Sequence, residues 1–285
     1  MKICAITGAG GWLGSRTAAT IQRAGWQVRR LERTPRDAED RRFALGAEVP
    51  PETLAGCDAL VHCAYDFRPV KWSDIETVNV RGTERLLTAA RVAGVRRITV
   101  VSTMSAFTGC VSLYGRAKLA IEAAGRDAGA LLLRPGLIYG DDSGGMFGRL
   151  VAQVRGGRFQ PVFGGGRQML NLIHEQDLCD FIQRHAAGEV ETPAQPLTAA
   201  HEKSWAFRAI LEALAGALGR RIAFVTVPWR GVWLALKCAE LCGLRLGFRS
   251  DSLVSLMNQN PRPDFSANEG CGLRCRAFDA TSLRL

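Results

Sequence analysis

Short apolar runs alternate with amphipathic segments over about the first 140 residues of the chain. The apolar runs are rich in β-branched residues, which predicts strands at 3–7, 26–31, 59–63, 98–102 and 130–133. The segments between them have the 3.6-residue periodicity of helices at 13–24, 75–93 and 112–124. Such alternation is typical of a parallel sheet with helices on both faces. The pattern therefore predicts an α/β fold with a Rossmann-like, doubly wound parallel sheet.

The pattern changes after about residue 140, where glycine-rich loops around one helix are predicted for 141–166. Further along, the periodicity predicts a strand and a helix in 171–187 and helices in 203–219 and 228–242, followed by a polar, irregular tail. We therefore expect two domains. A nucleotide-binding domain comprises 1–140 and 167–200, and a small C-terminal substrate lobe comprises 141–166 and 201–285.

Glycines recur between the first predicted strand and the first predicted helix, where residues 7–14 have the sequence TGAGGWLG. Gly8, Gly11 and Gly14 let the chain turn tightly and bring backbone N–H groups against a pyrophosphate at the helix N-terminus. This context favours a dinucleotide-binding loop over an ordinary structural turn. The sequence therefore predicts NAD or NADP as the cofactor.

The end of the second predicted strand bears on which dinucleotide binds. An acidic side chain there bonds the ribose 2′-hydroxyl, whereas an arginine accepts a 2′-phosphate. This chain has both, because Glu32 is followed by Arg33. We slightly favour NAD and leave NADP open.

A tyrosine and a lysine stand four residues apart, at Tyr114 and Lys118, in a chain with only three Tyr. On a helix this spacing places both side chains on one face. A nearby ammonium lowers the pKa of a phenol, which would make Tyr114 an acid/base near neutral pH. Thr103, just after the strand predicted at 98–102, offers a hydroxyl for a substrate oxygen. The Tyr114/Lys118 spacing and the Thr103 hydroxyl are each weak evidence for a catalytic site when taken alone.

Together these motifs make the chain resemble the extended short-chain dehydrogenase/reductases, the NAD-dependent epimerase/dehydratase group. Besides TGAGGWLG, six segments are similar to family motifs in the same order: DALVHCA at 58–64, NVRGT at 79–83, STMSAF at 102–107, YGRAK at 114–118, RPGLIYG at 134–140 and NLIHEQD at 171–177. The resemblance covers residues 1 to about 185.

The resemblance implies a role for each matching residue. The catalytic residues would be Thr103, Tyr114 and Lys118, with Lys118 also holding the cofactor ribose. The cofactor would be bound by Gly8, Gly11, Trp12 and Leu13 at the pyrophosphate, Asp58 and Ala59 at the adenine, and Cys63, Ala64, Tyr65 and Pro135 around the nicotinamide ribose and ring. His62, Asn79 and His174 would be hydrogen-bonding residues that tie strands to loops, and Asn79 is also counted among residues on the substrate side.

The substrate is less well defined than the cofactor. Nucleotide-sugar epimerases of the family bind a diphosphate with arginine, and the basic residues placed nearest to those positions are Arg167 and Arg262. Position 170, where the family often has arginine, is Leu170, and Met104-Ser105 stand where a dehydratase has acidic residues. We therefore expect an NAD(P)-dependent oxidoreductase or epimerase acting on a secondary alcohol or ketone, with a nucleotide sugar as one candidate. The alternatives are an NADPH-dependent carbonyl reductase on a non-nucleotide substrate and a non-catalytic dinucleotide sensor.

Composition and charge refine this picture. The formal charge is +10, but the basic residues are scattered and form no block, so we expect a small-molecule substrate and no nucleic acid. The nine cysteines form no metal-binding spacing, and we expect no metal.

No apolar run is long enough for a membrane span or a secretory signal, which favours the cytoplasm. The apolar segment 228–242 is interpreted as a core or lobe helix, with membrane-surface contact and homodimer packing left open.

Overall fold

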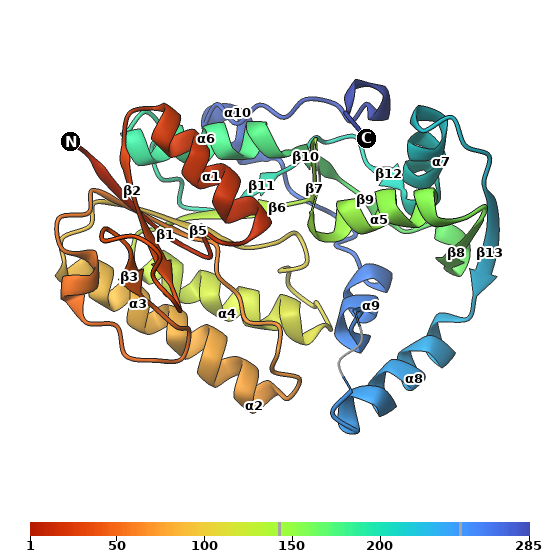
Figure 1. Cartoon of the computed structure of the whole chain (residues 1–285), viewed down its shortest axis with the longest axis horizontal. Helices are drawn as coiled ribbons and strands as arrows, with labels where there is room; N and C mark the ends of the chain where they lie inside the picture. Colours follow the sequence, from red (N-terminus) through yellow and green to blue (C-terminus); the bar gives the residue numbers. More distant parts are fainter. Residues whose placement is uncertain (142–143, 245–246) are drawn as a thin grey trace.

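A seven-stranded, all-parallel sheet forms the centre of the molecule, as the computed structural model of residues 1–141, 144–244 and 247–285 shows (Figure 1). Its strand order is β11-β6-β5-β4-β1-β2-β3. The strands are β1 (Ile3–Thr7), β2 (Gln27–Glu32), β3 (Arg41–Arg42), β4 (Ala59–His62), β5 (Arg97–Val101), β6 (Leu131–Pro135) and β11 (Leu197–Ala199). The Rossmann-like parallel sheet predicted from the sequence is confirmed.

Helices cover both faces of this sheet. One face is covered by α1 (Trp12–Arg23) and α6 (Glu175–Ala187), the other by α3 (Arg81–Val92) and α4 (Leu113–Asp127). Adjacent residues of β1 point to opposite faces, so that Cys4 and Ile6 join one hydrophobic cluster and Ala5 joins the other. The helix predicted for 75–93 is interrupted: α2 (Trp72–Ile75) is followed by a π-helical segment, Glu76–Val80, before α3.

A third hydrophobic cluster forms the core of the substrate lobe, with Tyr139, Phe147, Phe207, Leu211 and Phe278 among its buried residues. The lobe has three short strand pairs: β7 (Leu137–Tyr139) with β10 (Leu172–His174), β8 (Phe159–Phe163) with β13 (Ala223–Val227), and β9 (Met169–Leu170) with β12 (Trp205–Ala206). β7, β9 and β10 come from segments predicted to belong to the nucleotide-binding domain, but Tyr139, Leu170 and Leu172 are buried in the core of the lobe. Its helices are α5 (Gly145–Gly156), α7 (Phe207–Ala217), α8 (Trp229–Leu241) and α9 (Ser250–Met257). Of the loop segment predicted at 141–166, residues 142 and 143 lie outside the described residues.

The C-terminal segment departs from the expected division, because part of it packs on the nucleotide-binding domain. After α10 (Ser266–Gly270), Leu273 is buried in the same cluster as α1 and α6. Asn268 Nδ2 donates a hydrogen bond to the Thr198 carbonyl at 2.8 Å. Residues near 267–275 therefore return to the body of the molecule, although 201–285 was predicted to belong wholly to the lobe.

Of the two interpretations of segment 228–242, a core helix and a lobe helix, the exposure of α8 rules out the core helix. Leu236 is its one buried residue. None of the helices in the described ranges is both long and apolar enough to cross a membrane.

We expect Gly14→Ala to destabilise the protein by about 1–3 kcal/mol, because an added Cβ would lie 2.1 Å from the Gly8 carbonyl oxygen. Gly216→Ala is the matched control, since Gly216 lies within α7 and a Cβ there meets nothing within 4 Å. Urea unfolding should show a lower midpoint for the first variant and an unchanged or higher midpoint for the second. Equal stability of the two variants would contradict the close approach of α1 to the glycine loop.

Candidate active site

The glycine loop lies at the carboxyl end of β1, where open α/β sheets bind ligands. Gly8 adopts a positive φ of 69° and its carbonyl accepts a hydrogen bond from the Gly11 N–H at 2.9 Å. Helix α1 then begins at Trp12, and no side chain of the described residues caps its N-terminus. Its first N–H groups are therefore available to a ligand, and their partial positive charge suits a pyrophosphate.

A buried hydrogen-bond chain fixes the end of β1 beside the end of β4. His62 Nδ1 lies 2.7 Å from Thr7 Oγ1, and its Nε2 lies 2.9 Å from Thr83 Oγ1. Thr83 donates to the Asn79 carbonyl, so it accepts from His62 Nε2, and Thr7 in turn donates to Nδ1. Burial lowers the pKa of His62 to about 3, which keeps the imidazole neutral. His62 is a structural tie between the sheet and α3, consistent with the expectation.

Glu32 is positioned beside the glycine loop at the end of β2. Its Oε1 would lie 3.2 Å from a Cβ placed on Gly10, and its side chain is 12% exposed. Arg36 Nε stands 3.6 Å from the Glu32 carboxylate, whereas Arg33 is exposed. Of the two candidate residues at this strand end, Glu32 is the one directed toward the loop that would hold the cofactor.

The residues expected around the nicotinamide ribose also gather at this edge. The Ala64 N–H donates to Thr7 Oγ1 at 3.2 Å, and a Cβ on Gly8 would touch the backbone of Cys63 and Ala64. The Tyr65 ring packs edge-on against Tyr114, with centroids 4.9 Å apart. Pro135 ends β6 and its carbonyl accepts the Met104 N–H at 3.1 Å.

The three predicted catalytic residues lie together. Thr103 follows β5, and its hydroxyl is close enough to that of Tyr114 on α4 to lower the pKa of the phenol. Lys118 lies one turn further along α4, and its Nζ donates to the Val101 carbonyl at 2.7 Å. The Lys118 side chain is buried beneath the Tyr65 ring, with Nζ 5.2 Å from the ring centroid.

The titration of this group differs from the prediction that Lys118 lowers the pKa of Tyr114. Burial raises the pKa of Tyr114 to about 12, and the hydrogen bond from Thr103 offsets only part of that rise. Burial also lowers the pKa of Lys118 to about 8. The Lys118 ammonium donates to the Val101 carbonyl, and the pKa of Tyr114 is set by burial and the Thr103 hydroxyl. Tyr114 is therefore a protonated phenol at neutral pH.

Helix α4 is fixed to the sheet by a buried carboxylate, Glu122, which is 1% exposed. It accepts hydrogen bonds from Ser102 Oγ at 2.5 Å and from Arg134 at 2.8 and 2.6 Å. Ser102 immediately precedes Thr103, and Arg134 immediately precedes Pro135. The same carboxylate thus holds both strand ends in place relative to Tyr114.

Thr103 and Tyr114 open onto a cavity of about 370 Å³ between the nucleotide-binding domain and the lobe. Most of its surface area is apolar, and the apolar side chains that line it are Trp12, Phe67, Met104, Pro135, Leu137, Ile138, Met146, Met169, Leu170 and Leu256. Phe67, Met146 and Met169 are also exposed, so they form an apolar rim. Among the described lining residues, the charged side chains are Arg249 and Asp251, both at the start of α9.

Helix α9 closes one side of the cavity and is hydrogen-bonded to the catalytic segments. The Asp251 carboxylate accepts the N–H groups of Leu113 and Tyr114, at 2.7 and 2.9 Å. Ser255 Oγ donates to Ser105 Oγ at 2.9 Å. Arg249 donates to the Pro69 carbonyl at 2.9 Å. Asp251 therefore satisfies the first N–H groups of the helix that carries Tyr114 and Lys118.

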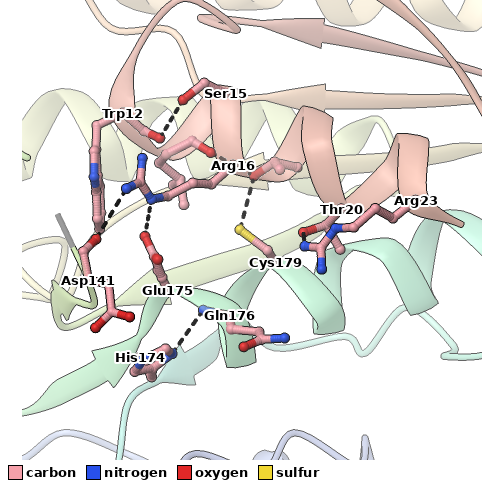
Figure 2. A network of polar contacts seen from close by, with 12 residues as sticks. Trp12, Ser15, Arg16, Thr20, Arg23, Asp141, His174, Glu175, Gln176 and Cys179 are labelled. Carbon is pink, nitrogen blue, oxygen red and sulfur yellow. Dashed lines mark hydrogen bonds and ion pairs between the residues drawn. The ribbon is translucent and has the colours of Figure 1, made fainter. Parts of the chain in front are cut away.

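Trp12, at the start of α1, also lines the cavity and belongs to a network of polar contacts (Figure 2). The Arg16 guanidinium stacks on the Trp12 ring, 4.7 Å from its centroid. Arg16 also pairs with Glu175 and donates to the Asp141 carbonyl at 3.2 Å. Figure 2 shows this network joining α1 to the start of α6 and to the loop that leads into the lobe.

Several residues predicted for the site lie elsewhere. Asp58 and Ala59 stand at the amino end of β4, opposite the glycine loop, and Asp58 binds the Ile3 N–H at 3.0 Å and Arg96 at 2.8 Å. The prediction that they contact adenine is wrong, because strand direction places them at the other edge of the sheet. Asn79 is fully buried, and its amide bonds both backbone groups of Asp66 at 2.7 and 3.0 Å. It shapes the loop after β4 and does not line the cavity.

The two arginines predicted to bind substrate are also outside the cavity. Arg167 and Arg262 are both exposed, and neither is among the lining residues. The predicted diphosphate site on these two side chains is therefore wrong. The basic side chain that does line the cavity is Arg249, whose Nε is buried without a hydrogen-bond partner within the described structure.

Sequence reasoning missed α9, which supplies Arg249, Asp251, Ser255 and Leu256 to the cavity. The available signal for a helix was the i, i+4 spacing of the polar Asp251 and Ser255, together with the i, i+3 spacing of the apolar Leu253 and Leu256. It was obscured by the polar residues that follow. No cluster of potential metal ligands is found among the residues that the structure describes.

Known proteins with similar sequences include two reductases. The chain is 29% identical over 222 residues to 4-hydroxy-2-methyl-3-oxo-4-farnesyl-3,4-dihydroquinoline-1-oxide ketoreductase of Stigmatella aurantiaca, a match that covers 65% of this chain and 66% of that protein, just under two thirds. It is 28% identical over 248 residues to ceramide reductase of Caulobacter vibrioides (strain NA1000 / CB15N), with 82% of this chain and 76% of that protein covered.

Solved structures share the whole fold. MoeE5 in complex with UDP-glucuronic acid and NAD matches with a TM-score of 0.73 at 20% identity, over 98% of this chain and 95% of that one. At this identity the likeness shows the fold alone. The model of the NAD-dependent epimerase/dehydratase family matches residues 4–193, which is more than half of the chain and includes the glycine loop and the Tyr114–Lys118 helix. The chain belongs to the NAD-dependent epimerase/dehydratase family.

Proposed function

We propose that this protein is an NAD-dependent reductase that converts a ketone in an apolar substrate to the secondary alcohol. The observation that carries this proposal is the hydroxyl pair of Thr103 and Tyr114, which opens onto a cavity lined mainly by apolar side chains. The ketoreductase and the ceramide reductase to which the chain is similar support it, since farnesyl groups and ceramides are apolar.

Tyr114 would act as the acid in this reaction. Its pKa of about 12 keeps the phenol protonated at neutral pH, and a protonated phenol can donate to a carbonyl oxygen that gains negative charge. Thr103 would hold the same oxygen by a second hydrogen bond. The Lys118 ammonium, buried one turn further along α4, would hold the cofactor ribose.

The residues present fit a dinucleotide. The open N-terminus of α1 and the glycine backbone at Gly8 and Gly11 would hold the pyrophosphate, and the Glu32 carboxylate would accept a hydrogen bond from the adenosine 2′-hydroxyl. Reduced NAD, when bound, supplies hydride to the carbonyl carbon. A carboxylate at this position repels a 2′-phosphate, so we infer NAD rather than NADP.

A nucleotide-sugar epimerase is the second candidate, favoured by one observation. Arg249 lines the cavity and its buried Nε has no hydrogen-bond partner within the described structure, so its guanidinium could bind a phosphate. The exposure of Arg167 and Arg262 weighs against this reading. We therefore favour the apolar ketone.

The proposal predicts that purified protein oxidises NADH in the presence of a long-chain aliphatic ketone and that Tyr114→Phe loses turnover by about 10² or more. The variant should retain NADH binding, measured by fluorescence titration, because the ring stays packed against Tyr65. Tyr139→Phe is the matched control, since Tyr139 is a buried lobe tyrosine that donates to the Ala277 carbonyl and is not part of the cavity lining.

UDP-glucose serves as the competing substrate in the same experiment. Interconversion of UDP-glucose with its 4-epimer, and no reaction with the ketone, would replace the reductase proposal by the epimerase. Near-wild-type turnover in Tyr114→Phe would show that another group supplies the proton.

A pH profile tests the charge on Lys118, whose pKa is lowered to about 8. Below that pH the ammonium is present, and above it the charge is lost while Tyr114 remains protonated. We expect kcat/KM for reduction to fall by about tenfold per pH unit above pH 8. Residual activity of Lys118→Arg should lack this fall, because guanidinium stays charged. A wild-type profile that is flat to about pH 10 would refute the role of the ammonium.

Cofactor choice tests Glu32. We expect Glu32→Gln to bind NADP more tightly relative to NAD by about tenfold or more, since it removes the charge that repels a 2′-phosphate. Glu39→Gln, an exposed glutamate on the loop after β2, controls for the change in net charge. If wild type prefers NADP and Arg33→Gln abolishes that preference, then Arg33, and not Glu32, determines which cofactor binds.

A further inference from the structure

Helix α8 presents an unusual surface for an exposed helix. Leu234 and Leu241 are 57% and 73% exposed, and Leu244, just beyond the helix, is 61% exposed. Trp229 and Trp233 are half-buried on the same helix. Figure 1 shows α8 at the lower right of the molecule, beside α9 and away from the central sheet. Large apolar side chains in such a position mark an interaction surface.

The strand pair that leads into α8 has an apolar outer face. The register pairs Phe159 with Ala223, Pro161 with Val225 and Phe163 with Val227, so all six side chains point to the same side. Phe224 points the other way, where the Arg208 guanidinium lies 4.4 Å from its ring centroid. Phe159 and Val225 on the outer face are 69% and 47% exposed.

The outer face of this pair and α8 are connected. The chain passes from β13 through Pro228 directly into α8. The Phe163 ring stacks on Phe248, with centroids 6.5 Å apart, and Phe248 precedes α9, against which α8 packs. We call this surface, formed by residues 155–163 and 218–244, the α8 face.

The charges of the α8 face are almost all positive. Residues 155–163 and 218–244 contain six basic residues and one acidic residue. Five of the six basic residues are exposed, namely Arg155, Arg158, Arg220, Arg221 and Arg230. The single acid, Glu240, is turned inward, where its side chain is 12% exposed and accepts both the N–H and the hydroxyl of Ser250, at 2.8 and 2.7 Å. In these two segments every exposed ionised side chain is therefore a cation.

We propose that the α8 face binds the surface of a lipid bilayer that contains anionic phospholipids. Leu234, Leu241 and the tryptophans would enter the headgroup region, and the arginines would meet lipid phosphates. Apolar and cationic side chains match such an interface, because arginines pair with the lipid phosphates while the apolar side chains reach the acyl boundary beneath them. This inference does not depend on the proposed function.

The charge pattern also distinguishes a bilayer from a second copy of the chain. Two α8 faces meeting about a two-fold axis would place arginines against arginines without acidic partners. Like charges brought together in this way oppose association. An anionic bilayer supplies the charge that the protein surface lacks.

Co-sedimentation of the full chain with vesicles tests the proposal. We expect binding to equimolar phosphatidylcholine and phosphatidylglycerol, little binding to phosphatidylcholine alone, and weaker binding as salt is raised. The double variant Leu234→Glu/Leu241→Glu should lose affinity by about tenfold or more, and Arg220→Gln/Arg221→Gln should lose a similar amount.

Matched controls lie on α3 and α4, outside the two segments that form the α8 face. Val92→Glu changes an exposed apolar residue of α3, and Arg91→Gln/Arg126→Gln removes two exposed charges from α3 and α4. Both should bind vesicles like wild type. Thermal unfolding of every variant separates lost binding from lost folding.

Three results would overturn the proposal. The first is no sedimentation of wild type with the anionic vesicles at low salt. The second is loss of binding in the control variants to the same extent as in the α8 variants. The third is a wild-type dimer in light scattering that Leu234→Glu/Leu241→Glu converts to a monomer, which would assign the α8 face to a second copy of the chain.

Discussion

The geometry of the candidate active site depends on one buried carboxylate. Glu122 joins α4 to the ends of β5 and β6 through Ser102 and Arg134, and these three elements carry the hydroxyls and the proline that border the reacting position. Removing one partner of such a buried pair leaves an uncompensated charge, which costs about 3–5 kcal/mol. The bidentate contact with Arg134 fixes the orientation of the Glu122 carboxylate relative to β6 as well as its distance from that strand. Tyr114 is thus positioned by a residue two helical turns away that touches neither substrate nor cofactor.

How well the sequence predicts each part follows from how local its signals are. β1 spans Ile3–Thr7 as predicted, and Thr103, Tyr114 and Lys118 come together because a strand end and one helix face suffice to place them. The error at Asp58 has a different origin. The motif was recognised correctly, but a parallel strand has two ends, and only its carboxyl end borders the cofactor loop.

Long-range contacts explain the remaining errors. Asp251 reaches Tyr114 across 137 positions, and Arg16 reaches Asp141 across 125, so neither contact leaves a trace in local periodicity. Arg167 and Arg262 were chosen by their position relative to motifs, yet the chain between motifs decides which side chains enter the cavity. There α9 places Arg249 instead. The sequence likewise left open whether the apolar helix α8 is a core helix, a lobe helix or a surface helix, because hydrophobic composition alone does not distinguish a buried face from an exposed one.

Two neighbouring residues connect the α8 face to the catalytic helix. Ser250 bonds Glu240 of α8, and Asp251 bonds the first N–H groups of α4. The cavity rim of Phe67, Met146 and Met169 is apolar as well, so a substrate with a long hydrocarbon part would contact compatible side chains from entry to the hydroxyl pair. An apolar ketone partitions into a bilayer rather than water. Binding at the α8 face would therefore bring α9, which closes the cavity, close to the phase in which such a substrate is concentrated.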